Sequence, residues 1–183
     1  MKLSRLYEDA KQHPDPSKMT PEEAFNYAHE IIEDRWPEAE PIIMQDPKWA
    51  YFYARDVIED DRWPEAEPTI IKDPGWAFWY TRNVIKDRWP EAEETIKKDP
   101  EWAYYYAYEV IKGPWPEAEP IIIQVPNLAF WYARFVIRGP WPEAEPIIKK
   151  SIWWKDYQKY VIEPWQRKQE VIKKRRGIPE ENG

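Results

Sequence analysis

The residues best suited to chemistry are pairs of glutamates that recur along the chain. They are Glu38/Glu40, Glu65/Glu67, Glu91/Glu93, Glu117/Glu119 and Glu143/Glu145. Two neighbouring carboxylates can serve in acid–base catalysis or bind a cation. A catalytic site is normally unique, whereas this pair is repeated at a fixed interval. We therefore interpret the glutamates as structural: they complement helix dipoles and pair with Arg35, Arg62 and Arg88. An acidic row that mimics nucleic-acid phosphates is the remaining alternative.

Other side chains used in catalysis are scarce. The 183-residue chain has no cysteine, two histidines and five glycines. Without cysteine there is no thiol nucleophile, disulfide or Cys-ligated zinc. His13 and His29 both lie near the N-terminus, and His29 is expected at the surface. The sequence contains neither a glycine-rich phosphate loop nor a nucleophile elbow. We predict a protein that is not an enzyme and needs no cofactor or metal.

Aromatic rings and arginines form a second recurring pattern, with the spacing of one helix face. The pairs are Tyr51/Arg55, Phe78/Arg82, Tyr104/Tyr108 and Phe130/Arg134, with Phe52, Trp79, Tyr105 and Trp131 beside them. These residue types are enriched at interface hot spots, and they also suit stacked bases and phosphates. We call these residues the ring–arginine stripe and consider them candidate binding residues on an exposed face. The alternative, that neighbouring helices bury the rings, stays open at this point.

An internal repeat positions these residues. The motif Trp-Pro-Glu-Ala-Glu begins at Trp36, Trp63, Trp89, Trp115 and Trp141, at intervals of 27, 26, 26 and 26 residues. A second motif, Asp-Pro-x-Trp-Ala, follows at Asp46, Asp73 and Asp99, with a looser copy at Val125. Self-similarity at such a period is typical of repeat architectures.

Each repeat is predicted to form two short helices. Pro37 suits the first position of the first helix, and Asp46-Pro47 suits the N-cap and first position of the second. Pro41 is unfavourable inside a helix, although Glu94 at the equivalent position is helix-compatible. Gly113 and Gly139 are expected to end the second helix in later copies. A core-facing stripe is predicted along that helix in every copy. In the first copy it consists of Trp49, Ala50, Tyr53, Ala54 and Val57.

The pattern predicts an all-α fold. We expect an α-solenoid of about five 26-residue helix–turn–helix repeats, with divergent N- and C-terminal caps. Residues 1–35 are assigned to the N-terminal cap with a divergent half repeat, residues 36–150 to the tandem repeats, and residues 151–183 to a basic C-terminal cap with a short tail.

The composition agrees with a repeat of aromatic helices. The chain has 13 Trp, 12 Tyr and 20 Pro, and its mean hydropathy of -0.88 is misleading because that scale treats Trp and Tyr as polar. These rings supply enough apolar surface for a core. The sequence has no apolar run long enough for a membrane helix and no secretory signal. We expect a cytoplasmic protein with no membrane partner.

Charge is unevenly distributed along the chain. The net charge is -7, and residues 149–176 carry ten Lys/Arg against three Asp/Glu, a local balance of +7. With two Glu in residues 177–183, residues 1–148 carry -12. The acidic body argues against binding to double-stranded nucleic acid. Oppositely charged ends are compatible with a homo-oligomer or an acidic partner, while a hydrophobic cap is the simpler interpretation of the last segment.

The two motifs together resemble tandem repeats of uncharacterised bacteriophage and bacterial proteins, over about residues 20–165. The resemblance implies a helical repeat and a viral origin, and in that case the host cytoplasm, but it carries over no function. A consensus-designed repeat is the other origin left open. The leading hypothesis is a scaffold that binds a partner protein, such as a phage protein that blocks a host factor. The alternatives are a binder that sequesters a nucleotide or phosphorylated small molecule, and a self-assembling structural protein.

Overall fold

A computed structural model describes residues 13–59 and 62–176 of the chain. These residues form helices and turns only, which confirms the all-α prediction. The chain divides into two compact units, residues 1–85 and residues 86–183, and each is described by itself. Residues 1–12 of the predicted N-terminal cap and the tail 177–183 lie outside the described residues.

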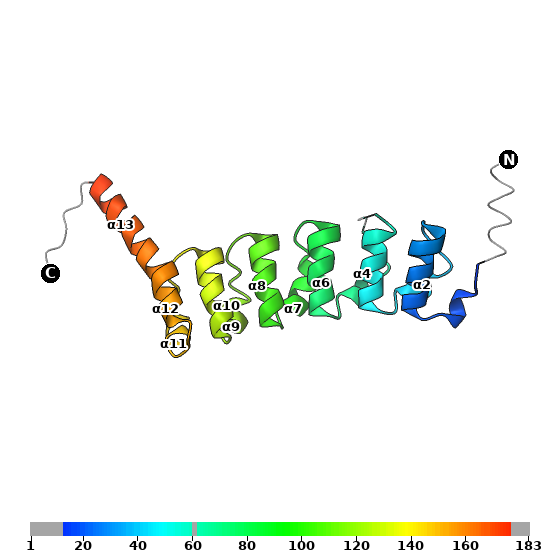
Figure 1. The fold of residues 1–183 in the computed structure, drawn as a ribbon, viewed down its shortest axis with the longest axis horizontal. Helices are drawn as coiled ribbons and strands as arrows, with labels where there is room; N and C mark the ends of the chain where they lie inside the picture. Colours follow the sequence, from blue (N-terminus) through cyan, green and yellow to red (C-terminus); the bar gives the residue numbers. More distant parts are fainter. Residues whose placement is uncertain (1–12, 60–61, 177–183) are drawn as a thin grey trace. The chain divides into compact units, whose positions relative to one another are not determined.

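The first unit holds the N-terminal cap and two repeats (Figure 1). Its elements are the 3₁₀ turn η1 (Pro16–Lys18), α2 (Pro21–Tyr27), the π-helix η2 (Ala28–Ile32), α3 (Glu40–Ile43), α4 (Pro47–Asp56), α5 (Glu67–Ile70), α6 (Pro74–Tyr80) and the π-helix η3 (Thr81–Ile85). The longer helices α2, α4 and α6 pack side by side, and the short helices α3 and α5 lie against them.

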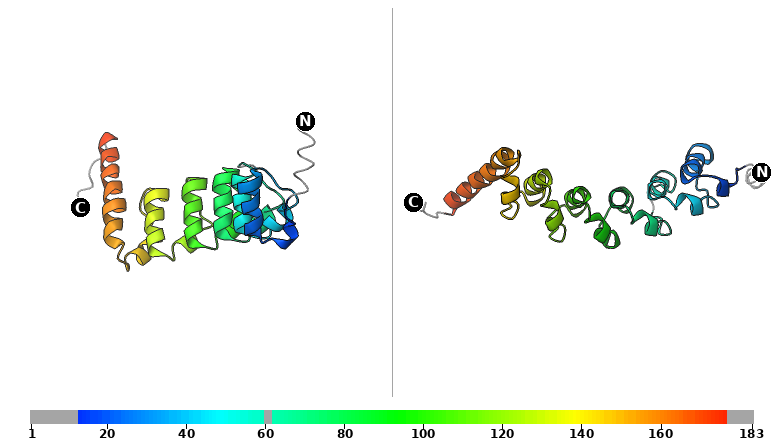
Figure 2. Two further views of the ribbon diagram at one scale, coloured as in Figure 1. Left: turned by 45° about the vertical axis from the view of Figure 1, so that its right-hand side comes forward. Right: turned by 90° about the horizontal axis from the view of Figure 1, so that it is seen from below.

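The second unit holds three repeats and the C-terminal cap. Its elements are α7 (Pro90–Ile96), α8 (Pro100–Tyr105), η4 (Tyr106–Ile111), α9 (Glu119–Ile122), α10 (Pro126–Trp131), η5 (Tyr132–Ile137), α11 (Glu145–Ile148), α12 (Trp154–Tyr157), η6 (Gln158–Ile162) and α13 (Glu163–Arg175). Segments η4, η5 and η6 are π-helices that continue the second helix of each repeat. Within this unit the longer helices again stand in one layer and the short ones in another, the arrangement of an α-solenoid (Figure 2).

Side-chain caps start most of the second helices. The Oδ1 atom of Asp46 accepts hydrogen bonds from the backbone N–H groups of Lys48 and Trp49, and Asp73 and Asp99 cap α6 and α8 in the same way. Thr20 and Glu23 form a capping box at the start of α2. These contacts confirm the predicted N-caps and satisfy N–H groups that a helix leaves unpaired at its start. Val125 cannot accept such a bond, so α10 begins without a side-chain cap.

A proline shortens the first helix in four of the five repeats. Pro41, Pro68, Pro120 and Pro146 each lie within the first two positions of a four-residue helix, where a missing N–H is tolerated. The predicted start at Pro37 is therefore wrong, because residues 37–39 form a turn and α3 begins at Glu40. In the third repeat Glu94 replaces this proline, and α7 runs without a break from Pro90 to Ile96.

A residue in the left-handed conformation follows five of the second helices, directly after η2, η3, η4 and η5 and three residues after the last residue of α4. These residues are Glu33, Glu59, Lys86, Lys112 and Arg138, with φ between 55° and 64°. The prediction that Gly113 and Gly139 end the helices is therefore wrong by one residue. Each glycine follows the left-handed residue, and its N–H donates to a carbonyl of the preceding helix. At Gly139 a side chain would meet the ring of Trp165 at 3.2 Å, so close packing explains the glycine there.

The core follows the predicted stripe in part, and Val57 and its equivalent Val110 are half-buried rather than buried. Ala50, Tyr53 and Ala54 are fully buried, as are the equivalent alanines and tyrosines of the other copies. Trp49, Trp76 and Trp102, which the pattern also assigned to the core, are only half-buried. The first tryptophan of each repeat is instead the buried one, and Trp63 is 2% exposed. The apolar core thus lies between the two helices of each pair.

Candidate functional site

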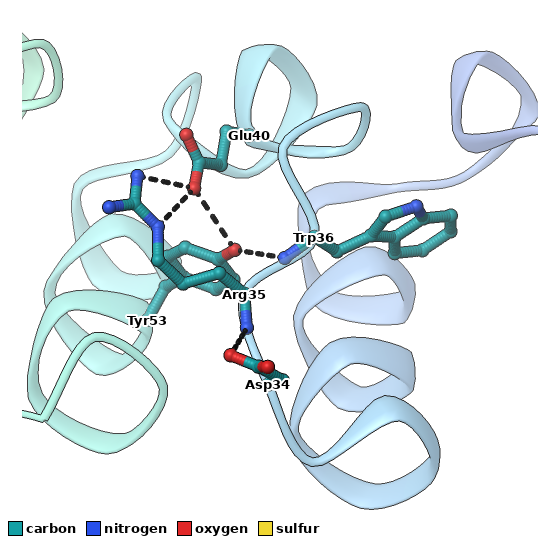
Figure 3. Close-up of polar contacts among 5 residues, drawn as sticks. All are labelled: Asp34, Arg35, Trp36, Glu40 and Tyr53. Atoms are coloured by element: carbon teal, nitrogen blue, oxygen red, sulfur yellow. Dashed lines mark hydrogen bonds and ion pairs between the residues drawn. The ribbon is translucent and has the colours of Figure 1, made fainter. Parts of the chain in front are cut away.

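A tyrosine links the two helices of each repeat through a hydrogen-bonded cluster (Figure 3). The Tyr53 hydroxyl accepts from the backbone N–H of Trp36 at 2.7 Å and donates to Glu40 Oε1 at 3.2 Å. The same Glu40 oxygen accepts from Nε and Nη2 of Arg35. The ring of Tyr53 also packs against Trp63 of the next repeat, with centroids 5.0 Å apart. We call this arrangement the tyrosine cluster.

The tyrosine cluster recurs in every repeat. Its other copies are Tyr80/Trp63/Glu67/Arg62, Tyr106/Trp89/Glu93/Arg88, Tyr132/Trp115/Glu119 and Tyr157/Trp141/Glu145. Pro114 and Pro140 replace the arginine in the last two copies. The sequence shows this signal as a Tyr sixteen or seventeen residues after each Trp-Pro motif, but it does not reveal the hydrogen bond.

Burial controls the chemistry of these hydroxyls. It raises the pKa of Tyr53, Tyr80, Tyr106 and Tyr132 well above the usual range, and that of Tyr157 to about 12. The phenols therefore stay protonated and donate to the second glutamate of each pair. The first glutamate, such as Glu38, is exposed. Pairing of the second glutamate with Arg35, Arg62 and Arg88 confirms part of the structural interpretation of the glutamates.

The predicted ring–arginine stripe is only partly a surface. Tyr51, Phe78, Tyr104 and Phe130 are buried, with exposed fractions of 1–5%. Their predicted outward orientation is therefore wrong. A second helix is covered from both sides by its neighbours in the stack, so its buried arc is wider than that of a helix with one packed face. In the first unit Trp76 covers the ring of Tyr51, and in the second unit Trp131 covers Tyr104 and Trp153 covers Phe130.

The adjacent rings remain partly accessible. Phe52, Trp79, Tyr105 and Trp131 are half-buried, and Tyr108 is 45% exposed. The half-buried tryptophans Trp49 and Trp76 lie against Phe52, with ring centroids 5.7–5.9 Å apart. The structure therefore offers ring edges to solvent rather than the continuous aromatic face that the helix spacing predicts.

The arginines of the stripe have different surroundings. Arg55 forms an ion pair with Asp56 and donates to the Tyr51 hydroxyl, and the bond to Asp56 raises its pKa. Arg82 lies 5.3 Å from the ring centroid of Trp79 and is exposed. Arg134 stacks on Tyr160 and Phe135, at 4.4 and 4.8 Å from their centroids. His29 is exposed, as predicted, and stacks on Phe25.

The second unit contains a groove between the ends of its second helices. One hollow of about 530 Å³ lies between the ends of η4 and η5. A smaller hollow of about 160 Å³ lies between η5 and the junction of η6 with α13, and Arg138 borders both. Their lining includes the aromatic residues Tyr108, Phe135, Tyr160 and Trp165 and the basic residues Lys112, Arg134, Arg138 and Lys168. We call these eight residues the aromatic–basic groove.

Two members of the predicted stripe, Tyr108 and Arg134, belong to this groove. The other six residues were not singled out as site residues by sequence reasoning. Lys112 and Arg138 occupy the left-handed position directly after η4 and η5, which is visible in sequence only as the residue before Gly113 or Gly139. Trp165, on α13, reaches the groove because its ring lies close to Gly139. This contact depends on the direction of α13 and has no local sequence signal.

The described residues hold no group of three or more His, Asp or Glu side chains that could bind a metal ion. Among them, every buried side-chain nitrogen or oxygen atom has a hydrogen-bond partner. No helix in this part of the chain is both long and apolar enough to cross a membrane. Comparisons with protein-family models, with curated proteins and with solved structures found no match to the chain.

Proposed function

We propose that this chain is a non-enzymatic repeat protein that binds a partner protein through the aromatic–basic groove of its second unit. The observation that carries the proposal is the combination of exposed rings and cations around two adjacent hollows that share Arg138. Tyr108, Phe135 and Trp165 are 45%, 38% and 41% exposed, and Lys112, Arg138 and Lys168 are exposed beside them. Exposed rings next to arginines are typical of interface hot spots.

The chemistry of the groove favours an acidic partner segment with apolar side chains. Its basic residues outnumber the one acidic residue of the lining, Glu109. The rings offer apolar contact to a side chain that enters between η4 and η5. A volume of about 530 Å³ between two helix ends suits a peptide segment lying across the surface. In a phage context, a protein of this kind would act in the host cytoplasm by binding and blocking a host factor.

The tyrosine clusters support a binding role over a catalytic one. Each is a copy of the same arrangement: its hydroxyl is engaged with a Trp backbone N–H and a Glu carboxylate, and in three copies that carboxylate also pairs with an Arg. A catalytic acid or base needs a proton that a substrate can reach. Because these groups hold the helices of a repeat together, the exposed groove is the better candidate for function.

The proposal is tested with fluorescently labelled peptides. An acidic peptide of alternating Glu and Phe residues is titrated with the protein and followed by anisotropy, beside a Lys/Phe peptide and ATP. We expect binding of the acidic peptide only, and a loss of affinity of about tenfold or more in the Arg134→Glu/Arg138→Glu variant, as for hot-spot residues. The control Lys98→Glu/Lys150→Glu changes the net charge equally, away from the groove, and should bind like the wild type.

Two results would contradict the proposal. Equal losses in the groove variant and in the control would show that net charge alone attracts the peptide. Binding of ATP without binding of the peptide would favour the nucleotide-sequestering alternative. Circular dichroism of both variants checks that the substitutions leave the helices intact.

A further inference from the structure

The first unit has a hollow at the same place in the repeat, but with opposite charge. It lies between the ends of η2 and α4, has a volume of about 150 Å³ and is lined by His29, Glu33, Asp34, Asp56, Val57 and Glu59. Repeat by repeat, Glu33 and Glu59 correspond to Lys112 and Arg138, and all four have the left-handed conformation. These four residues thus share the left-handed conformation, while their side chains change sign.

The negative charge at this end of the first unit is only partly balanced. Asp56 pairs with Arg55, and Arg35 pairs with Glu40 rather than with the loop. Glu33, Asp34 and Glu59 are exposed. His29 also faces this hollow. The apolar side chain of Val57 lines the hollow beside these carboxylates. The loop ends therefore combine carboxylates with an apolar side chain, which is the chemistry proposed for the occupant of the groove.

We infer that the occupant of the aromatic–basic groove is a second copy of this chain, bound through its acidic loop ends at Glu33 and Glu59. This inference rests on the proposed function and names the partner. Lys112 and Arg138 of one copy would face Glu33 and Glu59 of the other, and Tyr108 and Phe135 would lie over the hollow that Val57 lines. Complementary charges speed encounter and fix the orientation of the two surfaces.

The contact joins two different surfaces. The first unit of one copy binds the second unit of the next, so the association is heterologous and leaves one surface of each kind unoccupied in a dimer. It therefore continues head to tail until a ring closes or a chain forms. A partner protein with an acidic segment would compete for the same groove, so self-association would also regulate binding.

The test is sedimentation velocity of the full chain over a concentration series. We expect concentration-dependent association in about 0.01 M salt and its loss in about 1 M salt, where the Debye length is about 3 Å. The loop variant Glu33→Lys/Glu59→Lys and the groove variant Lys112→Glu/Arg138→Glu should each associate at least about tenfold more weakly than the wild type. Lys98→Glu/Lys150→Glu is the control and should associate like the wild type.

Mixing the two variants supplies the decisive measurement. The loop variant keeps a native groove and the groove variant keeps native loop ends, so an equimolar mixture should regain association. A wild-type protein that stays monomeric in low salt, or a mixture that regains nothing, would overturn the inference. The acidic-peptide assay separates this failure from that of the proposed function, because the loop variant should still bind the peptide and the groove variant should not.

Discussion

The residues that follow the second helices change from acidic to basic along the chain while keeping the left-handed conformation. Acidic Glu33 and Glu59 follow the first two second helices, and basic Lys86, Lys112 and Arg138 follow the next three, all in the left-handed conformation. His29 occupies the repeat position that Tyr108 occupies in the second unit. The tyrosine cluster, in contrast, keeps its Tyr, Trp and Glu in both units. The repeat thus separates positions that maintain the fold from positions that present a surface.

This difference has a physical basis. The Tyr53 hydroxyl and its equivalents satisfy a buried backbone N–H, and replacing them leaves a polar group without a partner. The left-handed residues point into solvent, where exchanging Glu for Lys has little effect on stability. Surface charge can therefore change from repeat to repeat without loss of the solenoid. The predictions below test the shared framework first and the variable surface last.

Alkaline unfolding tests whether the framework is common to both units, and we expect it to have the largest effect. Burial raises the pKa of Tyr53 and Tyr106, and that of Tyr157 to about 12, from an ordinary value of 10.0. Above pH 10.0 the unfolded chain binds fewer protons than the folded chain, so the free energy of unfolding falls as pH rises through the folded values. Below that pH this stabilisation is fully present.

Far-UV circular dichroism and tyrosinate absorbance measure this transition. We expect helix loss and ionisation of the buried tyrosines to coincide over the same pH range in both units. Ionisation of these tyrosines while the helices persist would show that the hydroxyls are not buried as described. Two well-separated transitions would show that the framework differs between the units.

Single Tyr→Phe substitutions test the cluster more finely. Tyr53→Phe in the first unit removes the hydroxyl that accepts from the buried backbone N–H of Trp36. Tyr132→Phe in the second unit does the same for the backbone N–H of Trp115. Each should lower the free energy of unfolding by about 1–3 kcal/mol, the cost of an unsatisfied buried donor. The exposed Tyr108→Phe is the matched control and should change stability by less than about 0.5 kcal/mol. Urea denaturation gives all three values; unequal losses in Tyr53→Phe and Tyr132→Phe would break the equivalence of the units.

Substitutions at the left-handed residues should give the smallest change in stability. They also distinguish an effect on the fold from an effect on the binding surface. Glu33→Gly and Lys112→Gly both relieve the strain of a positive φ, which costs a non-glycine residue about 1–2 kcal/mol. Glycine offsets part of this gain because it loses more backbone entropy on folding. We expect a net gain of about 0.5 kcal/mol in each unit. Only Lys112→Gly should also weaken binding of the acidic peptide. A Glu33→Ala control keeps the strain and should give no gain.

Much of the framework follows from local sequence. Asp46-Pro47 places a cap and a helix start by local hydrogen bonding, and the interval between Trp-Pro motifs predicts the repeat. The spacing of Ala50, Tyr53 and Ala54 predicts the buried face because helix geometry alone brings them together. The start of the first helix is predicted less well. Pro41 is unfavourable in a helix that begins at Pro37 but is tolerated in one that begins at Glu40, and local sequence does not decide between the two.

The candidate site is largely a tertiary feature. The groove joins residues from η4, η5, η6 and α13, whose proximity depends on how successive helices stack. The ring–arginine stripe was predicted from one isolated helix, so it did not account for Trp76, Trp131 and Trp153 covering its rings from the next repeat. An outward position on a single helix is an inward one when a neighbour packs on that side.

The sequence by itself determined the repeat, the all-α class, the caps and the acidic-to-basic change along the chain, because these depend on residue type, period and interactions within a few residues. Only the tertiary structure decided which tryptophans are buried, which tyrosine hydroxyls hold Trp-Pro turns to the second helix, and which rings remain exposed. Burial depends on neighbours that are distant in sequence. In this chain those neighbours are other copies of the same motif.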